Sequence, residues 1–206
     1  MIAQQRSRGR LSLPTALAIG AFIIIFLYFL SSQPTPTMVE SEASSFPDLQ
    51  LSLSQTAASK TPSVSVSVKN TSPDTPVTIL KWDSPLDEAA LGLGLVSITP
   101  AGASEPIRID AVKLTRKMPP SADSLVTLFP GESVSNVIEL RQPRVPEDVL
   151  KAGEAKVMMK GRWMAIWPGL TTQELLQQPE KLQSVGAGSG GSLTGDWKTE
   201  TVGVGQ

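Results

Sequence analysis

The chain lacks two residue types on which many enzyme active sites depend. Its 206 residues include no His and no Cys, so the commonest neutral-pH acid–base group and the thiolate nucleophile are both missing. The same two residues hold most protein-bound zinc ions. We therefore expect no zinc catalysis and no cofactor. A Ser–Lys pair or two carboxylates could still catalyse hydrolysis, but no motif singles out such a pair, so an unrecognised hydrolase stays only an alternative.

Oxygen ligands are the remaining way to hold a metal ion. Asp83, Asp87 and Glu88 form the nearest approach to an acidic cluster. A calcium loop needs several acids close together with a Gly at the turn. The simpler interpretation is turn chemistry, in which Asp83 and Ser84 bond the local backbone ahead of Pro85. We therefore expect no metal site here.

The segment 162–167, Arg-Trp-Met-Ala-Ile-Trp, is dense in residue types enriched at protein contacts. Trp163 and Trp167 are four residues apart, which places both on one face of a regular strand. Exposed there, they and Arg162 would form a contact patch for a protein, or would stack on the rings of a sugar. The alternative is that both indoles pack in the core or under a following helix.

A second candidate site is a glycosylation sequon. Asn70, Thr71 and Ser72 match the acceptor pattern. They begin the loop 70–76, which has two prolines and where a glycan on Asn70 would be accessible. The other interpretation is an ordinary Asn at the end of a hairpin.

A strongly apolar run near the N-terminus determines the expected location of the protein. Residues 11–31 carry no charge and follow Arg6, Arg8 and Arg10, while the next charge after them is Glu40. About 20 helical residues span the roughly 30 Å hydrocarbon layer, and basic flanks stay in the cytoplasm. We predict a cytoplasmic tail over 1–10 and a single-pass signal-anchor over 11–31 that contacts the lipid bilayer. The rest of the chain would face the lumen or the exterior. A cleaved signal peptide is the alternative.

The remaining composition describes an exported, mildly acidic chain. There are 18 Lys and Arg against 19 Asp and Glu; three of the basic residues precede the apolar run, so the rest has a net charge near −4. This balance argues against a nucleic-acid partner. Residues 32–47 are rich in Pro, Ser and Thr and predict an extended stalk. Residues 48–206 are enough for one domain with its own core.

Apolar and polar residues alternate with a period of two over much of that domain, which predicts half-buried strands. Val64, Val66 and Val68 are the clearest example, and we assign them to one buried sheet face. Strands are expected at 49–53, 64–68, 77–82, 94–99, 106–110, 112–116, 125–129, 133–140, 154–163 and 197–204, with a helix at 171–182 and a flexible Gly/Ser-rich segment at 184–195. Many short strands with Pro and Gly turns predict an all-β fold, an immunoglobulin-like antiparallel β-sandwich behind a single N-terminal transmembrane helix.

Three short motifs carry a resemblance to a known family. They are Leu80-Lys-Trp-Asp-Ser-Pro-Leu-Asp87, Val112-Lys-Leu-Thr-Arg-Lys117 and Leu128-Phe-Pro-Gly-Glu-Ser133. Their order resembles the N-terminal β-sandwich that precedes the catalytic domain of deuterolysin and peptidyl-Lys metallopeptidases, over roughly 48–167. The resemblance implies a non-catalytic domain that contacts a zinc protease domain. No residue here inherits a zinc-binding role, since the protease motif requires His.

These observations favour a non-enzymatic protein-interaction module, anchored in a membrane and facing the lumen or exterior. A hydrolase domain is among the candidate partners, and contact through a sheet edge would leave few traces in the sequence. A carbohydrate-binding module that uses Trp163 and Trp167 is the second hypothesis.

Overall fold

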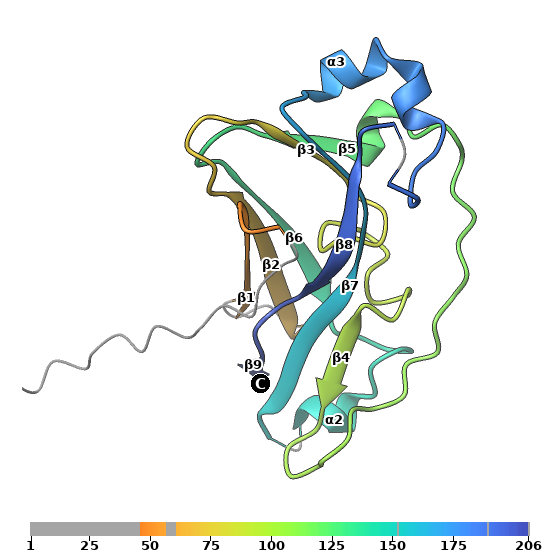
Figure 1. Ribbon diagram of the computed structural model, residues 1–206. Helices are drawn as coiled ribbons and strands as arrows, with labels where there is room; N and C mark the ends of the chain where they lie inside the picture. Colours follow the sequence, from red (N-terminus) through yellow and green to blue (C-terminus); the bar gives the residue numbers. More distant parts are fainter. Residues whose placement is uncertain (1–45, 57–60, 152, 189, 206) are drawn as a thin grey trace, which may run out of the picture. The chain divides into compact units, whose positions relative to one another are not determined.

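Two antiparallel sheets form the domain, as Figure 1 shows. The computed structural model describes residues 46–56, 61–151, 153–188 and 190–205. The first sheet has the order β1-β2-β6, and the second is built around β7. The strands of the first sheet are β1 (Leu49–Gln55), β2 (Ser63–Asn70) and β6 (Ser133–Glu139). Those of the second are β3 (Val77–Leu80), β4 (Val96–Thr99), β5 (Leu125–Leu128), β7 (Ala155–Pro168), β8 (Leu193–Lys198) and β9 (Val202–Val204). The all-β antiparallel prediction is confirmed.

The first sheet follows directly from the alternation in its sequence. In β2, Val64, Val66 and Val68 are all 0% exposed, which confirms their assignment to one buried face. Two of the three have apolar partners in β1: Leu51 pairs with Val68 and Leu53 with Val66, while Val64 pairs with Gln55. The intervening serines point to the outer face, so a one-residue slip of register would exchange core for solvent.

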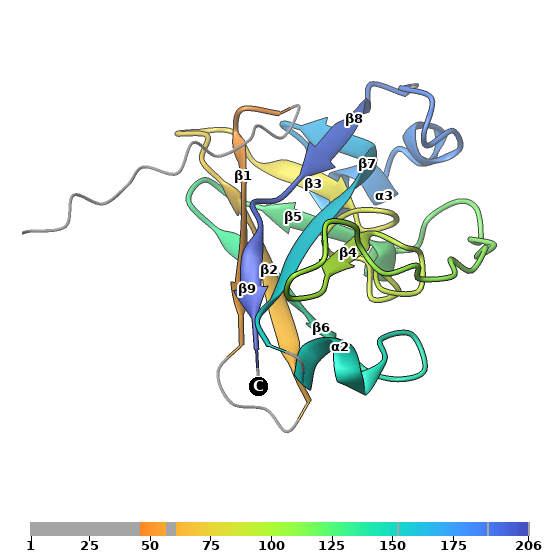
Figure 2. The same cartoon turned by 90° about the horizontal axis from the view of Figure 1, so that it is seen from below.

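The second sheet depends on the length of β7. Val157 pairs with Ile98 of β4 and with Val202 of β9, so these two strands lie on opposite edges of β7. Farther along, Ile166 pairs with Ile79 of β3 and with Leu193 of β8. One 14-residue strand therefore serves two sets of neighbours. Gln55 of β1 donates to the Gly205 carbonyl beside β9, so the two sheets approach closely at that side, as Figure 2 shows.

The segment 105–117, which we call the strap, contradicts the strands expected at 106–110 and 112–116. It is extended but belongs to no sheet. Its main-chain bonds to the domain include Ile107 N–H to Ile98 O at 2.8 Å and Val112 N–H to Gly92 O at 2.9 Å. Ile107 and Ile109 pack half-buried against the core. The alternation in the strap thus arises because one of its sides packs against the core. A β-ladder would also require the edge of another strand beside the strap.

The expected helix at 171–182 is present in two pieces. They are α3 (Thr172–Leu176) and the 3₁₀ turn η2 (Pro179–Leu182). Thr171 caps α3 through a reciprocal capping box with Glu174. A short α2 (Glu147–Lys151) and a 3₁₀ turn η1 (Ala122–Ser124) have no counterpart in the sequence prediction. The Gly/Ser-rich segment 184–195 includes turns and the start of β8.

The N-terminal predictions fall where the structure gives no description. The tail over 1–10, the anchor over 11–31 and nearly all of the stalk over 32–47 lie outside the described residues. Within the described part of the chain, no helix has the length and hydropathy needed to cross a bilayer.

The buried face of β2 gives a direct test of the fold. Val66→Asp should lower the free energy of unfolding by several kcal/mol, because it buries a carboxylate among apolar side chains. Ser65→Asp, on the outer face of the same strand, should cost less than about 1 kcal/mol. Chemical denaturation of both variants measures the two costs. Equal costs would contradict the assigned faces.

Candidate functional site

The two tryptophans expected to share a face lie on opposite faces of β7. Between Trp163 and Ile166 the register with β8 shifts, which marks a β-bulge. Trp163 and Ile166 belong to the main core between the sheets, whereas Ala165 and Trp167 belong to a second apolar cluster with Leu175 of α3. The extra residue reverses which side chains point inward after it. The shared-face prediction is wrong for this reason.

Neither indole is available to a partner. Trp163 and Trp167 are both 0% exposed. The Trp163 ring lies 6.0 Å from that of Trp197, tilted by 49°. The Trp167 Nε1–H has no hydrogen-bond partner in the described residues, so apolar packing holds that ring. The packed interpretation is the correct one, and a patch of stacked sugar rings on these residues is ruled out.

Arg162 is the exposed member of this segment. It points away from the core and pairs across the strands, with Nη1 3.6 Å from the Asp196 carboxylate and Nη2 3.3 Å from the Thr194 hydroxyl. Exposed pairs of this kind contribute little stability. Without its two tryptophans, Arg162 no longer belongs to a contact cluster.

Asn70 has a structural role in the fold. Its side chain is 0% exposed. Its Nδ2 donates to Thr75 O and to Leu128 O, each at 2.9 Å, and its Oδ1 accepts from Ser72 N–H at 3.0 Å. Both amide protons are used inside the protein, which argues against a glycan at Asn70 in the folded domain. The side chain links the end of β2 to β5 instead.

The acidic turn after β3 is organised by a single carboxylate. Asp87 is 3% exposed. Its Oδ2 accepts from Asp83 N–H at 2.8 Å and from Arg116 Nη2 at 2.6 Å, and its Oδ1 accepts from Ala89 N–H at 3.0 Å. The guanidinium of Arg116 also lies 5.9 Å from the centre of the Trp82 ring. An arginine therefore occupies the place that a cation would need.

The expected turn chemistry is present, with one change of residue. Ser84 Oγ donates to Lys81 O and accepts from Leu86 N–H, as predicted. The second bonding role belongs to Asp87 and not to the Asp83 side chain. Asp83 adopts φ 54°, a left-handed conformation that Asp tolerates. Burial, then the nearby charge of Asp87, raise the pKa of Asp83 above its ordinary 3.8, while Arg116 opposes this shift. Within the described residues, no three His, Cys, Asp or Glu side chains converge to hold a metal.

This turn connects elements of both sheets. Trp197 of β8 donates its Nε1–H to Asp83 O at 3.1 Å. It reaches the turn across Gly161, where a Cβ atom would lie 2.6 Å from the indole and 2.9 Å from Asp83 O. From the other sheet, Asn136 of β6 donates to Pro85 O and Asp87 O, each at 3.1 Å. The turn thus closes the side of the sandwich opposite β1 and β9.

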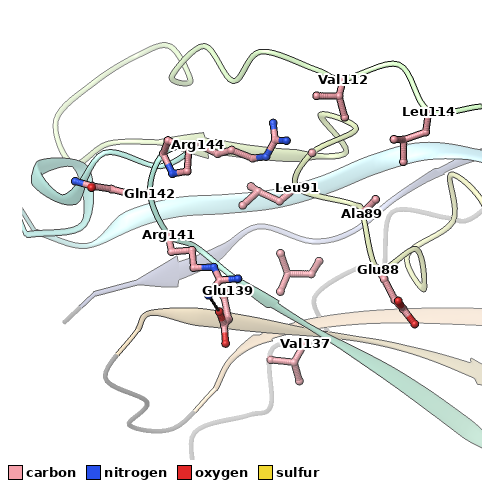
Figure 3. Close-up of a pocket in the computed structure, with 13 residues that line it drawn as sticks. Glu88, Ala89, Leu91, Val112, Leu114, Val137, Glu139, Arg141, Gln142 and Arg144 are labelled. Carbon is pink, nitrogen blue, oxygen red and sulfur yellow. Dashed lines mark ion pairs between the residues drawn. The ribbon is translucent and has the colours of Figure 1, made fainter.

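Beside this turn lies a groove, which we call the β6 groove, with a volume of about 710 Å³. Three of its side chains are apolar and largely exposed: Val112 at 40%, Leu114 at 43% and Val137 at 57%. Val112 and Leu114 come from the strap on one side of the groove. Val137 comes from β6 on the other side, and its side chain lies on the face of β6 that is turned away from the strap (Figure 3). Exposed apolar residues that line one concavity are a common feature of contact sites.

Charges of opposite sign lie toward the two ends of the β6 groove. Figure 3 shows Glu88 near one end and Arg141 and Arg144 toward the other. Arg141 forms an ion pair with Glu139 at 3.0 Å. Arg144 donates to the carbonyl of Asp110 at 3.2 Å and, within the described residues, has no carboxylate partner. The groove therefore offers one uncompensated cation.

Sequence reasoning missed this groove, although one signal was present. Val137 and Ile138 are adjacent apolar residues in a strand, so one of them must point outward. The alternation in the strap predicts sheet strands, and strands paired in a sheet would not place Val112 and Leu114 at the edge of an opening.

The comparison with known proteins places the domain in a family. A family model described as an immunoglobulin-like domain matches residues 48–205. The chain belongs to this immunoglobulin-like family. A relative from Arthroderma benhamiae, named as an uncharacterized secreted protein, is 30% identical over 149 residues, which are 71% of this chain and 70% of that protein. These findings support the immunoglobulin-like fold, and they show no relationship to the deuterolysin group.

Removal of the Asn70 side chain tests its structural role. Asn70→Ala should lower the free energy of unfolding by about 2 kcal/mol or more, because it leaves two buried carbonyls and one N–H without their partner. Thr71→Ala, an exposed change that keeps the sequon, should be nearly neutral. Thermal unfolding measures both, and mass spectrometry of the folded wild-type protein should show no glycan at Asn70. An occupied Asn70 in a folded protein would contradict the assignment.

Proposed function

We propose that this immunoglobulin-like domain is a non-enzymatic protein-interaction module, exported from the cytoplasm, and that the β6 groove is its contact surface. The observation that carries this proposal is that three exposed apolar residues, Val112, Leu114 and Val137, line one groove. Interfaces are built around apolar centres with a polar rim, and the charged ends of the groove supply such a rim.

The absence of His and Cys from the whole sequence supports a non-enzymatic role. The buried acid Asp87 is engaged by two backbone donors and an arginine, an arrangement that holds a turn in place. The groove residues include no nucleophile paired with a base. The groove therefore gives no support to the alternative of an unrecognised hydrolase.

The location is part of the same proposal. The basic flank at Arg6, Arg8 and Arg10 and the apolar run 11–31 support a membrane anchor with the domain on the lumenal or outer side. The secreted relative supports an extracellular site of action. The motif resemblance to the deuterolysin group supports a hydrolase domain as one candidate partner.

Photo-crosslinking in the full-length chain tests this function. A benzophenone amino acid at position 137 should form covalent adducts with another protein in the producing cells. The same probe at Ser52, an exposed residue on the outer face of β1, is the matched control and should form none. The adducts should remain in membranes after carbonate extraction if 11–31 is the anchor.

Equal labelling from both positions, or none from either, would contradict a contact surface at the β6 groove. Recovery of the chain only in the culture medium would refute the anchor and leave a secreted module.

A further inference from the structure

β6 is the edge strand of its sheet, and among the described strands it pairs with β2 alone. The N–H of Leu140, directly after β6, donates to Pro62 O on the β2 side at 2.8 Å. In an antiparallel pair, successive residues direct their backbone groups to opposite sides. The groups directed away from β2 therefore belong to Ser135, Val137 and Glu139.

These outward backbone groups have no hydrogen-bond partner among the described residues. Among the hydrogen bonds of the described residues, the turn after β3 reaches β6 only through the side chain of Asn136, which donates to Pro85 O and Asp87 O. The turn covers the core without completing a ladder. Three alternate residues thus present both a donor and an acceptor, which is the pattern that an added strand requires.

The open edge runs along the β6 groove. Val137, Ile138 and Glu139 line it on one side, and Val112 and Leu114 line it on the other. The outward side chains of β6 are otherwise polar, so Val137 is its one apolar contact on that face. A strand hydrogen-bonded to β6 would lie about 4.8 Å from it, within the groove. Alternate side chains of that strand would then lie on the strap side, next to Ile138, and the others would lie next to Val137 on the outer face.

The charged side chains at the two ends of the groove indicate which charges a bound segment should carry. Within the described part of the chain, Arg144 forms no ion pair with a carboxylate, and the exposed Glu88 forms none with a basic side chain. A carboxylate near Arg144 would form a charge-assisted bond. A basic group near Glu88 would complement the other end.

We propose that the β6 groove binds an extended linear segment of a partner protein as an added β-strand, with alternating apolar residues and an acidic residue at the Arg144 end. This inference rests on the proposed function, since it names what that contact surface recognises. The main-chain bonds provide affinity, while Val137 and Arg144 provide selectivity.

A random decapeptide library displayed on phage is the probe. Selection on the full-length chain in detergent micelles should enrich peptides that alternate apolar and polar residues and carry Asp or Glu near one end. Arg144→Gln should lower the affinity of the chain for an enriched synthetic peptide about tenfold. Lys69→Gln removes an exposed charge on β2, away from the groove, and is the matched control that should bind normally.

Residue-resolved amide exchange distinguishes strand addition from other docking. Bound peptide should slow exchange at the outward amides of Ser135, Val137 and Glu139. The neighbouring amides that already bond β2 should change little. The same peptide with alternate backbone nitrogens methylated should not bind, because it cannot donate to the edge.

Three outcomes would overturn the proposal. They are a library without binders, binders indifferent to Arg144 and to N-methylation, and outward amides already protected in a dimer of the chain. Adducts from position 137 without amide protection would preserve the contact surface and refute strand addition.

Discussion

The closed side of this sandwich depends on the hydrogen bonds that the buried carboxylate of Asp87 accepts. A carboxylate that is 3% exposed is costly unless donors replace its water. Here two backbone N–H groups and Arg116 do so. The first two donors shape the turn after β3, and the third ties the strap to it. Other side chains then attach that turn to each sheet, Asn136 from β6 and Trp197 from β8.

This way of closing a sandwich has a consequence for function. The turn supplies apolar cover and a few side-chain bonds, but it does not supply a strand for β6. The edge of β6 therefore keeps its outward donors and acceptors at Ser135, Val137 and Glu139. The strap, held by Arg116, adds Val112 and Leu114 at the rim of the same opening. The turn held by Asp87 thus covers the core and leaves the edge of β6 open. The proposed interaction takes place at that open edge.

The parts of the fold set by local alternation could be predicted from the sequence. Val64, Val66 and Val68 point inward because β2 is a regular strand with a polar residue between each pair. The exceptions are features that alternation does not encode. The bulge after Trp163 places Trp167 in a different cluster from Trp163, and no local residue pattern marked that extra residue.

The candidate site was missed for a related reason. The sequence at Asn70 predicts an exposed sequon. Only the folded structure shows that its side-chain amide donates to the carbonyls of Thr75 and Leu128. The strap has the alternation of a strand, but whether a ladder forms depends on which edge lies beside it. Arg116 and Asp87 are 29 residues apart, so their pairing could not be read from spacing.

The most direct test of this account is the substitution Asp87→Asn, compared with the exposed change Asp123→Asn. The amide keeps the size of the side chain but loses its charge and presents an NH₂ group to donors. We predict a loss of about 2 kcal/mol or more in unfolding free energy, with faster amide exchange at Val112, whose N–H bonds Gly92 O. If Asp87→Asn unfolds like Asp123→Asn and leaves the exchange of Val112 unchanged, then this carboxylate does not hold the turn and the strap, and the account is wrong.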